Sequence, residues 1–363
     1  MIPSHAESRG TRQHRILFLY SELAGYFLAC AEELGKHPEV EEVTIVHLPV
    51  NPEAPFQLAS SESYSLVPKA TLGEGLPAFV REFRPTALVC SGWMDADYNR
   101  IAREWCPRIP VVLTLDNWWT GSWKQRVAVW TSPWYIQRHF NRAWVPGAPQ
   151  KSFAEKLGFT GNRLATGFYC ADARPFQRVW EERQLRTPAK KILYIGRYLD
   201  VKGVRELWVA FSSLSDIYPD WELHCIGTGD LWDQRKIHPQ IVHHGFKQPH
   251  ELHPHLVDAA CFVMPSKAEP WGVVLHEMAI AGLPLLASDR VGAATAFLHD
   301  GENGFRFRPS GITTALGTFM DRFEPDNKVF DARSHGLGSH HNAVRWMASL
   351  FSILPGQVYE EIA

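Results

Sequence analysis

Short apolar runs alternate with helix-length segments along most of this chain. Residues 15–20 (RILFLY) form the first run, and the following segment, residues 22–35, places its apolar side chains at helical spacing. Further runs of strand length, separated by segments long enough for a helix, occupy residues 43–48, 87–90, 111–115 and 143–145. This repetition predicts parallel β-strands connected by helices, the pattern of an α/β domain.

A second series of strand-like runs follows a polar, charged stretch at residues 174–191, which we interpret as an interdomain linker. The runs of this series occupy residues 192–195, 222–226, 241–244, 261–264 and 283–287. A chain of 363 residues also exceeds the usual size of one hydrophobic core. We therefore expect two Rossmann-like domains whose parallel sheets face a central cleft, with residues 1–175 in the N-terminal domain and residues 186–330 in the C-terminal domain.

The end of the chain carries a third apolar pattern. Residues 339–354 place five apolar side chains at helical spacing, namely Val344, Met347, Leu350, Phe351 and Leu354. The pattern predicts an amphipathic helix, whose apolar face must dock on another part of the protein. We expect the segment 335–363 to return to the N-terminal domain.

Composition restricts the classes of function. The charges nearly balance, with 37 Lys and Arg against 39 Asp and Glu, so the chain has no general attraction to nucleic acid and any basic site must be local. The six cysteines are scattered without a Cys-x-x-Cys pair, which indicates free thiols in a reducing compartment. The polar first residues lack the apolar core of a signal peptide, and no apolar stretch reaches membrane-spanning length. These features predict a cytoplasmic protein.

Two loops carry the residues on which a functional prediction depends. The strand at 192–195 leads into GRYLDVKG (residues 196–203), and the strand at 261–264 leads toward EPWGVVLHE (residues 269–277). Arg197 and Lys202 can converge on one diphosphate, which the Arg would bind through its planar guanidinium and the Lys as a point charge. The alternative interpretation is that both are solvated cations on the surface. Both loops would leave neighbouring strands at one edge of a parallel sheet, where helix N-termini attract anions. We predict a phosphate site at this edge.

Residues 191–307 resemble the C-terminal half of retaining glycosyltransferases with the GT-B fold, of the family 4 or group 1 type. The resemblance rests on an ordered set of short motifs, which is far more specific than any one of them. They are Gly196-Arg197, Lys202-Gly203, Ile226-Gly227-Thr228-Gly229, Gly245-Phe246, Pro265-Ser266, Glu269 with Glu277 in an E-x7-E spacing, Ser288-Asp289, Gly292 and Asn303-Gly304.

The resemblance implies separate roles for the two glutamates. Glu269 would contact hydroxyls of the transferred sugar, and Glu277 would bind the ribose of the nucleotide. Pro270 suits the first turn of a helix and would leave Glu269 in the preceding loop. The remaining candidates for donor binding are the amides of Trp271, Gly272 and Val273 and the turns at Gly196, Gly227, Gly245 and Phe246. Arg197, Lys202 and Glu269 form the candidate catalytic set. The alternatives are a helix-terminal charge for Glu269 and a locally paired surface residue for Glu277.

The N-terminal half matches the family less closely. Its first loop, residues 21–26, lacks the usual paired glycines, although Gly25 can still let a substrate approach the backbone. Where the family often carries a His, the run VLTLDN (residues 112–117) places Asp116. Asp116 is either a polar contact in the cleft or an Asx turn or helix cap. Both residues are assigned to the acceptor side.

The segment 117–154 contains no Asp or Glu. It combines six tryptophans with five cations, namely Trp118, Trp119, Trp123, Trp130, Trp134 and Trp144 with Lys124, Arg126, Arg138, Arg142 and Lys151. This mixture suits sugar stacking, a lipid-phosphate acceptor or a membrane surface. Buried tryptophans with solvated cations are the alternative. Peripheral contact with the inner face of a membrane through residues 118–151 is therefore one hypothesis.

Histidines are frequent between residues 238 and 255, where six occur: His238, His243, His244, His250, His253 and His255. Their spacing lacks the Cys or carboxylate partners typical of zinc sites. The Asp-x-Asp sequence at Asp95 and Asp97 lies in the N-terminal half, away from the predicted diphosphate. We expect metal-independent chemistry, with no cofactor besides the nucleotide-sugar donor.

Together these features predict a retaining hexosyltransferase. It would move a sugar from a nucleoside-diphosphate sugar to a glycan, a lipid-linked acceptor or a small molecule, without nucleic acid as a partner. Domain closure would exclude water, and no side chain would act as the nucleophile. Two alternatives stay open: a nucleotide-sugar epimerase or hydrolase on the same fold, and a non-catalytic nucleotide-sugar-binding subunit.

Overall fold

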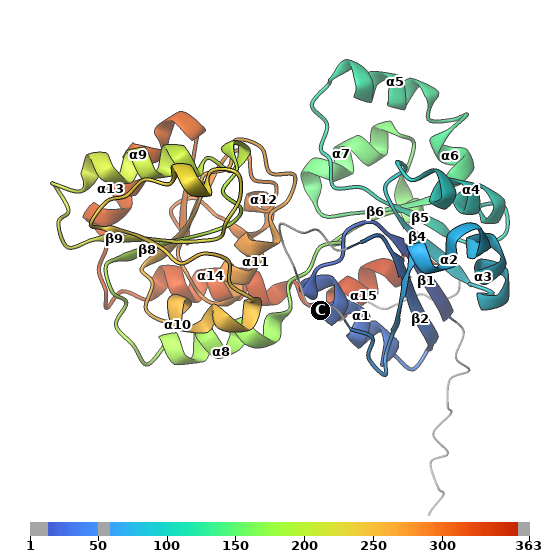
Figure 1. Ribbon diagram of the computed structural model, residues 1–363, viewed down its shortest axis with the longest axis horizontal. Helices are drawn as coiled ribbons and strands as arrows, with labels where there is room; N and C mark the ends of the chain where they lie inside the picture. Colours follow the sequence, from blue (N-terminus) through green and yellow to red (C-terminus); the bar gives the residue numbers. More distant parts are fainter. Residues whose placement is uncertain (1–13, 50–58, 355–363) are drawn as a thin grey trace, which may run out of the picture.

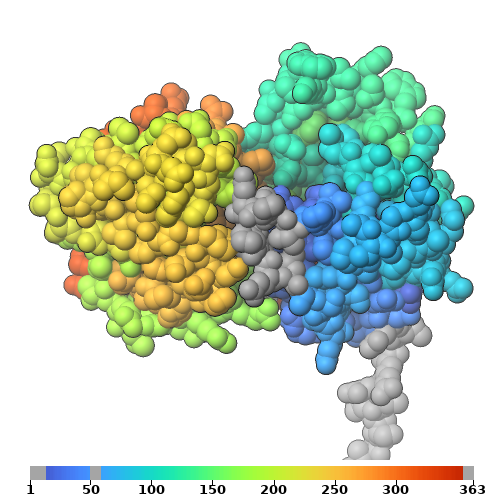
Figure 2. All heavy atoms as spheres, in the orientation of Figure 1, coloured from blue at the N-terminus to red at the C-terminus, as the bar shows by residue number. Residues whose placement is uncertain are grey.

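The computed structural model describes residues 14–49 and 59–354, which form two lobes. Figure 1 shows one sheet with flanking helices in each lobe, and Figure 2 shows the lobes as separate masses that meet along a junction. This arrangement confirms the predicted pair of α/β domains with parallel sheets. Residues 1–13, 50–58 and 355–363 of the predicted domains lie outside the described residues.

The N-terminal lobe contains a seven-stranded sheet in the order β3-β2-β1-β4-β5-β6-β7, with every neighbouring pair parallel. Its strands are β1 (His14–Tyr20), β2 (Val40–His47), β3 (Ser65–Pro68), β4 (Ala87–Ser91), β5 (Val111–Thr114), β6 (Arg142–Val145) and β7 (Leu164–Thr166). The central strands are apolar throughout because helices cover both faces of a parallel sheet. Those helices are α1 (Gly25–Gly35), α2 (Lys69–Leu72), α3 (Leu76–Phe83), α4 (Ala96–Trp105), α5 (Trp123–Thr131), α6 (Ile136–His139) and α7 (Ala148–Lys156), with 3-10 turns η1 (Gly73–Gly75) and η2 (Gly161–Arg163).

The C-terminal lobe contains a six-stranded parallel sheet in the order β10-β9-β8-β11-β12-β13. Its strands are β8 (Lys191–Ile195), β9 (Glu222–Ile226), β10 (Ile241–His243), β11 (Cys261–Met264), β12 (Leu285–Ser288) and β13 (Gly304–Phe307). Its helices are α8 (Ala173–Arg183), α9 (Val204–Leu214), α10 (His253–Leu256), α11 (Val273–Ile280), α12 (Ala294–Phe297), α13 (Ile312–Arg322) and α14 (Val329–His340), with 3-10 turns η3 (Asp200–Lys202), η4 (Trp232–Gln234), η5 (Pro249–Glu251) and η6 (Pro309–Gly311). Strands β8 and β11 are neighbours, so the two loops with the predicted chemistry do leave the sheet at one edge.

The stretch 174–191 is not the linker that its polarity suggested. Most of it is helix α8, which begins after Asp172, whose carboxylate accepts from the backbone N–H of Arg174. Phe176 and Val179 face inward and join the core of the C-terminal lobe. An amphipathic helix with a strongly charged outer face has few apolar residues, which explains why the strand-based pattern missed it.

The C-terminal helices divide between the lobes. Helix α14 packs on α11 in the C-terminal lobe, and α15 (Ala343–Phe351) then packs on α1 in the N-terminal lobe, as Figure 1 shows in red beside blue. The return of the chain is confirmed, but it begins at α15 rather than at residue 335. Trp346 anchors it, since its indole N–H donates to the carbonyl of Phe168 at 2.6 Å and its ring packs against Trp144.

Candidate active site

A cleft of about 850 Å³ lies between the two lobes. Arg197, Lys202 and Glu269 line it from the C-terminal lobe, and Asp116 lines it from the N-terminal lobe. All three members of the predicted catalytic set therefore share one cavity. They come from the loops that follow β8 and β11, at the carboxyl edge of the sheet, where open α/β sheets bind ligands.

Glycines bring the loops of this edge into direct contact. Gly227 has φ 138°, and a Cβ at this position would lie 2.0 Å from the carbonyl oxygen of Gly196. Its backbone N–H donates to the carbonyl of Gly245 at 2.8 Å. The turns after β8, β9 and β10 therefore touch one another, and at Gly227 only glycine fits without a clash. The sequence had placed all three glycines in the donor site.

Backbone hydrogen bonds hold the loop that carries Glu269. The N–H of Glu269 donates to the carbonyl of Arg290, and the N–H of Gly292 donates back to the carbonyl of Glu269, both at 3.0 Å. Gly272, with φ 94°, turns the chain into α11. The helix thus begins at Val273, so the prediction that Pro270 lies in its first turn is wrong. Pro270 lies in the loop because the tight turn at Gly272 comes between it and the helix.

Lys202 and Glu269 form an ion pair across the two loops. The Glu269 side chain is 11% exposed and that of Lys202 is 20% exposed. The sequence assigned the cation to phosphate and the carboxylate to sugar without placing them in contact. Because both charges are largely removed from water, each offsets part of the desolvation cost of the other.

A second cavity of about 250 Å³ opens beside the cleft. It is lined by Gly196, Gly227, Phe246 and Glu277 from the C-terminal lobe and by Gly25 from the N-terminus of α1. Arg197 and Val273 line both cavities. The predicted donor-binding residues are thereby divided: Pro270, Trp271 and Gly272 line the large cleft, and Gly196, Gly227, Phe246 and Glu277 line the smaller cavity. Gly245 lines neither of these two cavities.

Glu277, the second glutamate of the E-x7-E spacing, has a buried carboxyl group. Burial, with a smaller contribution from the charge of Asp172, raises its pKa to about 7. The neighbouring His276 fixes the helix on which it stands. The His276 Nδ1 accepts from the N–H of Ala171 at 3.1 Å, and its Nε2–H donates to the carbonyl of Gly338 at 2.9 Å. Glu277 therefore stands on a helix that is hydrogen-bonded to the segment before α8 and to α14.

Asp116 lies in the cleft, as one of its two interpretations required. The Tyr169 hydroxyl donates to its Oδ2 at 3.3 Å, and burial raises the pKa of the carboxyl, with Glu269 and Glu22 adding to the effect. It caps no helix: the residue that caps α5 is Ser122, whose hydroxyl accepts from the N–H of Gln125. A carboxyl facing Glu269 across the cleft suits contact with a polar substrate.

Two contacts between the lobes escaped the sequence analysis. The buried Gln150 of α7 donates through Nε2 to the carbonyl of Asp116 at 3.0 Å and to the carbonyl of Pro270 at 2.5 Å. Next to it, a Cβ on Gly147 would lie 2.6 Å from the Trp271 ring. These residues set the separation of the lobes at the cleft. A Gln and a Gly carry no local pattern that would reveal such contacts.

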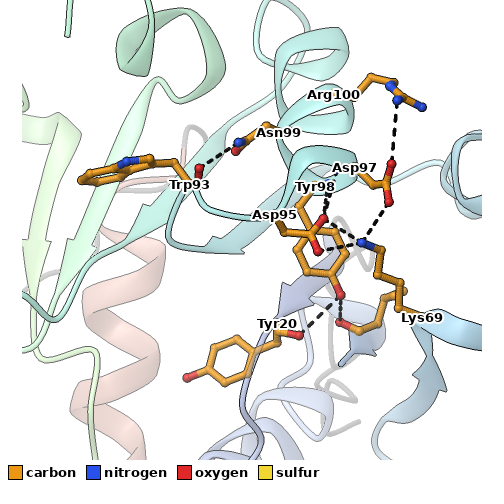
Figure 3. A network of polar contacts seen from close by, with 9 residues as sticks. Tyr20, Lys69, Trp93, Asp95, Asp97, Tyr98, Asn99 and Arg100 are labelled. Carbon is orange, nitrogen blue, oxygen red and sulfur yellow. Dashed lines mark hydrogen bonds and ion pairs between the residues drawn. The ribbon is translucent and has the colours of Figure 1, made fainter. Parts of the chain in front are cut away.

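The Asp-x-Asp sequence has a structural role. Asp95 caps α4 by accepting from the N–H groups of Asp97 and Tyr98, and both aspartates bind the ammonium of Lys69, as Figure 3 shows. The Tyr98 hydroxyl donates to the carbonyl of Val46 at 3.1 Å. These bonds hold the loop between β4 and α4, which lines the cleft.

The arrangement of two lobes is similar to that of several solved structures, which include WaaG, a glycosyltransferase involved in lipopolysaccharide biosynthesis. Sucrose-phosphate synthase from Thermosynechococcus elongatus is similar with a TM-score of 0.61 and 19% identity over 93% of this chain and 95% of that chain. Anabaena HepE in complex with UDP is similar with a TM-score of 0.67 and 14% identity over 93% of this chain and 100% of that chain. These likenesses establish the fold.

The sequence supports the same relationship. Residues 177–328 match the profile of the family Glycosyl transferases group 1. A glycogen synthase of Mycobacterium tuberculosis is 32% identical over 261 residues, which cover 66% of this chain and 61% of that protein. The chain has the GT-B fold, and its residues 177–328 are similar to the Glycosyl transferases group 1 family. The chain spans about 61% of the length of the mycobacterial relative, and about 51% of that of a sulfoquinovosyl transferase of Arabidopsis thaliana, which is 26% identical.

The tryptophan-rich segment divides into three parts. Trp144 is core. Trp118 and Lys124 line a cavity of about 540 Å³ that also reaches Glu269 and Pro270. Trp123, Trp130 and Trp134 are exposed by 72%, 71% and 59%, on or just after α5. The interpretation as buried core is therefore correct for Trp144, and contact of the exposed tryptophans with an acceptor or a membrane stays a prediction.

No helix in residues 14–49 and 59–354 is both long enough and apolar enough to span a bilayer. All six cysteines lie in these ranges and are free thiols, of which only Cys106 is not buried.

Proposed function

We propose that this protein transfers a sugar from a nucleoside-diphosphate sugar to an acceptor, with retention of the anomeric configuration. The observation that carries the proposal is the placement of Arg197, Lys202 and Glu269 in one cleft beside the cavity that contains Glu277. The diphosphate would lie at the junction of the two cavities, which Arg197 lines from both sides. The nucleoside would then fill the smaller cavity, and the sugar would face Glu269.

Donor binding would exchange the partners of the Lys202–Glu269 ion pair. The Lys202 ammonium would turn to a phosphate oxygen, and the Glu269 carboxylate would accept hydrogen bonds from sugar hydroxyls. Each charge is thus partnered both before and after binding, which avoids the cost of a buried unpaired charge. The pair also makes an empty site less attractive to free phosphate, since the anion must compete with Glu269 for the lysine.

In the transfer step, the bond from the anomeric carbon to the diphosphate oxygen breaks and the acceptor oxygen bonds to that carbon on the same face. The acceptor's proton passes to the departing phosphate. Arg197 and Lys202 stabilise the charge that grows on this leaving group, and this requires no covalent bond to the protein. The carboxyl of Asp116 would contact the acceptor or the sugar from the opposite lobe.

A panel of UDP, GDP, ADP and TDP sugars tests the donor class by thermal shift. UDP-glucose is the first choice, because similar structures were solved with UDP and with UDP and glucose. A ligand at a hundredfold its Kd stabilises the protein by about 2.7 kcal/mol. Product analysis with and without acceptors then separates a transferase from an epimerase or hydrolase. The proposal fails if no sugar nucleotide raises Tm, or if turnover needs no acceptor.

The raised pKa of Glu277 predicts a pH-dependent affinity for the donor. The ionised carboxylate accepts two hydrogen bonds from a ribose diol, so it is the binding form. Because the group gains a proton as pH falls through about 7, donor affinity should decline below neutrality, by about tenfold per pH unit at the limit. Titration calorimetry with an intact sugar nucleotide, whose diphosphate does not titrate in this range, measures the profile.

Glu277→Gln is the matched control for this prediction. It keeps the size of the side chain and removes the ionisation, so its affinity should be weaker than that of the wild type at pH 8 and unchanged by acidification. A wild-type profile that stays flat between pH 8 and pH 6 would show that Glu277 does not bind the ribose as a carboxylate.

The exposed face of α5 is a candidate contact with a membrane that holds a lipid-linked acceptor. Trp123, Val127, Trp130 and Trp134 follow one another at helical spacing and are all exposed. The segment around them, residues 117–154, carries five cations and no acidic residue. Indole rings and cations together favour the interface of an anionic bilayer.

Replacing Trp130 and Trp134 by Ser should weaken sedimentation with vesicles that contain an anionic phospholipid, by about tenfold or more. Ile217→Ser is the control, because Ile217 is 66% exposed but lies in the C-terminal lobe. Equal binding of all variants, or no binding of the wild type, would assign the tryptophans to another partner. Transfer to a small soluble acceptor should be unaffected.

A further inference from the structure

Three histidines converge near the smaller cavity of about 250 Å³, where the nucleoside of the donor would bind. We call this cavity the nucleotide cavity. His224 stands on β9, His244 follows the last residue of β10, and His255 stands on α10. One imidazole nitrogen from each lies within 4.8 Å of the others, and all three residues are half-buried. The spacing of the histidines between residues 238 and 255 did not indicate a zinc site, and His224 lies outside that stretch. Three separate elements supply this cluster, so no linear spacing could reveal it.

The geometry points to a binding site for a divalent transition-metal ion of the zinc type, and we propose His224, His244 and His255 as its protein ligands. Zinc binds imidazole nitrogens at about 2.0–2.1 Å, which places two tetrahedral ligands roughly 3.3 Å apart. The Nε2 of His244 and the Nδ1 of His224 are 3.1 Å apart, close to this separation. A rotation of the His255 ring, whose centroid lies 4.4 Å from that of His244, completes the three-nitrogen face.

A carboxylate orients the first ligand. The Nε2 of His224 lies 2.9 Å from an oxygen of Glu222, two residues earlier on the same strand. This contact places the ring proton on Nε2 and leaves Nδ1, the nitrogen that faces His244, with a free lone pair. Metal-bound histidines characteristically donate their other N–H to a carboxylate in this way. The adjacent His243 is oriented otherwise, since its nitrogens contact the Tyr198 hydroxyl and the carbonyl of Lys236.

The surrounding charges are compatible with a cation. Lys191 and Lys247 are near, but Lys191 is paired with Asp258 and Lys247 lies 3.8 Å from a carboxylate oxygen of Glu251. The neutral form of an imidazole is the form that binds a metal ion. Three neutral imidazoles leave one tetrahedral position for water.

The ion would fix one wall of the nucleotide cavity. His244 and His255 bracket the segment that supplies Phe246, Lys247, Pro249 and Leu252 to that cavity. A metal that joins the ends of this segment to β9 would hold it in place without touching the donor. The role is structural, and the transfer chemistry stays independent of the metal.

The test uses the full chain, stripped with a chelator and dialysed, and titrated with Zn²⁺ alone. Calorimetry should show one equivalent bound, and saturation should raise Tm by about 5 °C. Co²⁺ in place of zinc should give the intense visible absorption of a tetrahedral site. His244→Ala and His255→Ala should each weaken zinc binding by more than about a hundredfold, and Glu222→Gln by about tenfold.

His250→Ala is the matched control, because His250 is an exposed histidine of the same segment outside the cluster, and it should bind zinc as the wild type does. His255→Gln replaces His255→Ala if the latter does not fold, as judged by circular dichroism without metal. The proposal is overturned if the wild type binds no stoichiometric zinc, or if the cluster variants bind it as tightly as His250→Ala. In that case the histidines form a hydrogen-bonded group only.

Discussion

Arg197→Ala is expected to lower kcat for sugar transfer by about 10²–10³-fold, with a much smaller change in the Kd of the donor. Arg197 borders both cavities, where the diphosphate would bridge the nucleoside and the sugar. Its charge would count most in the transition state, when the bond to the anomeric carbon breaks and negative charge grows on the phosphate. Initial rates with saturating donor, together with calorimetric binding of the intact donor, separate the two effects.

Two further variants sharpen this result. Arg197→Lys keeps the charge and loses the planar fork, so it should recover only part of the rate. Arg205→Ala removes a cation of the same lobe that contacts Gln234 on the surface, and it should leave kcat unchanged. A wild-type kcat in Arg197→Ala, with donor binding intact, would remove Arg197 from the catalytic set and leave stabilisation of the leaving group to Lys202.

The donor side could be predicted from sequence because its residues stand at the ends of strands. A strand, a glycine turn and a charged residue form one contiguous pattern, and the parallel topology then brings the patterns to one edge. Arg197 was placed by this rule, whereas the role of Glu277 came from the resemblance to the GT-B glycosyltransferases. The Lys202–Glu269 ion pair was not, because it joins loops 67 residues apart and depends on the register of β8 beside β11.

The acceptor side was less predictable because its contacts have no local signature. The side-chain amide of Gln150 donates a hydrogen bond to the opposite lobe. Gly147 lets the Trp271 ring of that lobe pack closely because it has no side chain.

Some strands also lack a local sequence pattern that would predict them. Strands β3, β7 and β13 escaped prediction because they are short and lie at or next to the edges of the sheets, where exposure weakens the apolar pattern.

The largest stability effect is expected at a residue that the sequence placed in a linker. Arg183 of α8 is 1% exposed, and its guanidinium donates to Asp331 of α14 at 2.8 Å and to the carbonyls of Leu256 and Ala259 at 3.0 and 2.7 Å. Asp331→Ala leaves this guanidinium buried without its counter-charge. We expect the free energy of unfolding to fall by about 3–5 kcal/mol, measured by urea denaturation of the variant and the wild type.

A double substitution distinguishes the cost of the unpaired charge from the loss of packing. Arg183→Met combined with Asp331→Leu replaces the pair by apolar side chains of similar length, and it should be less destabilised than Asp331→Ala because no charge is left buried. Burial raises the pKa of Asp331 despite the adjacent Arg183, which indicates that this ion pair is costly to bury. If Asp331→Ala lost less than about 1 kcal/mol while the double variant lost more, the two carbonyls alone would suffice for the guanidinium and packing would dominate at this site.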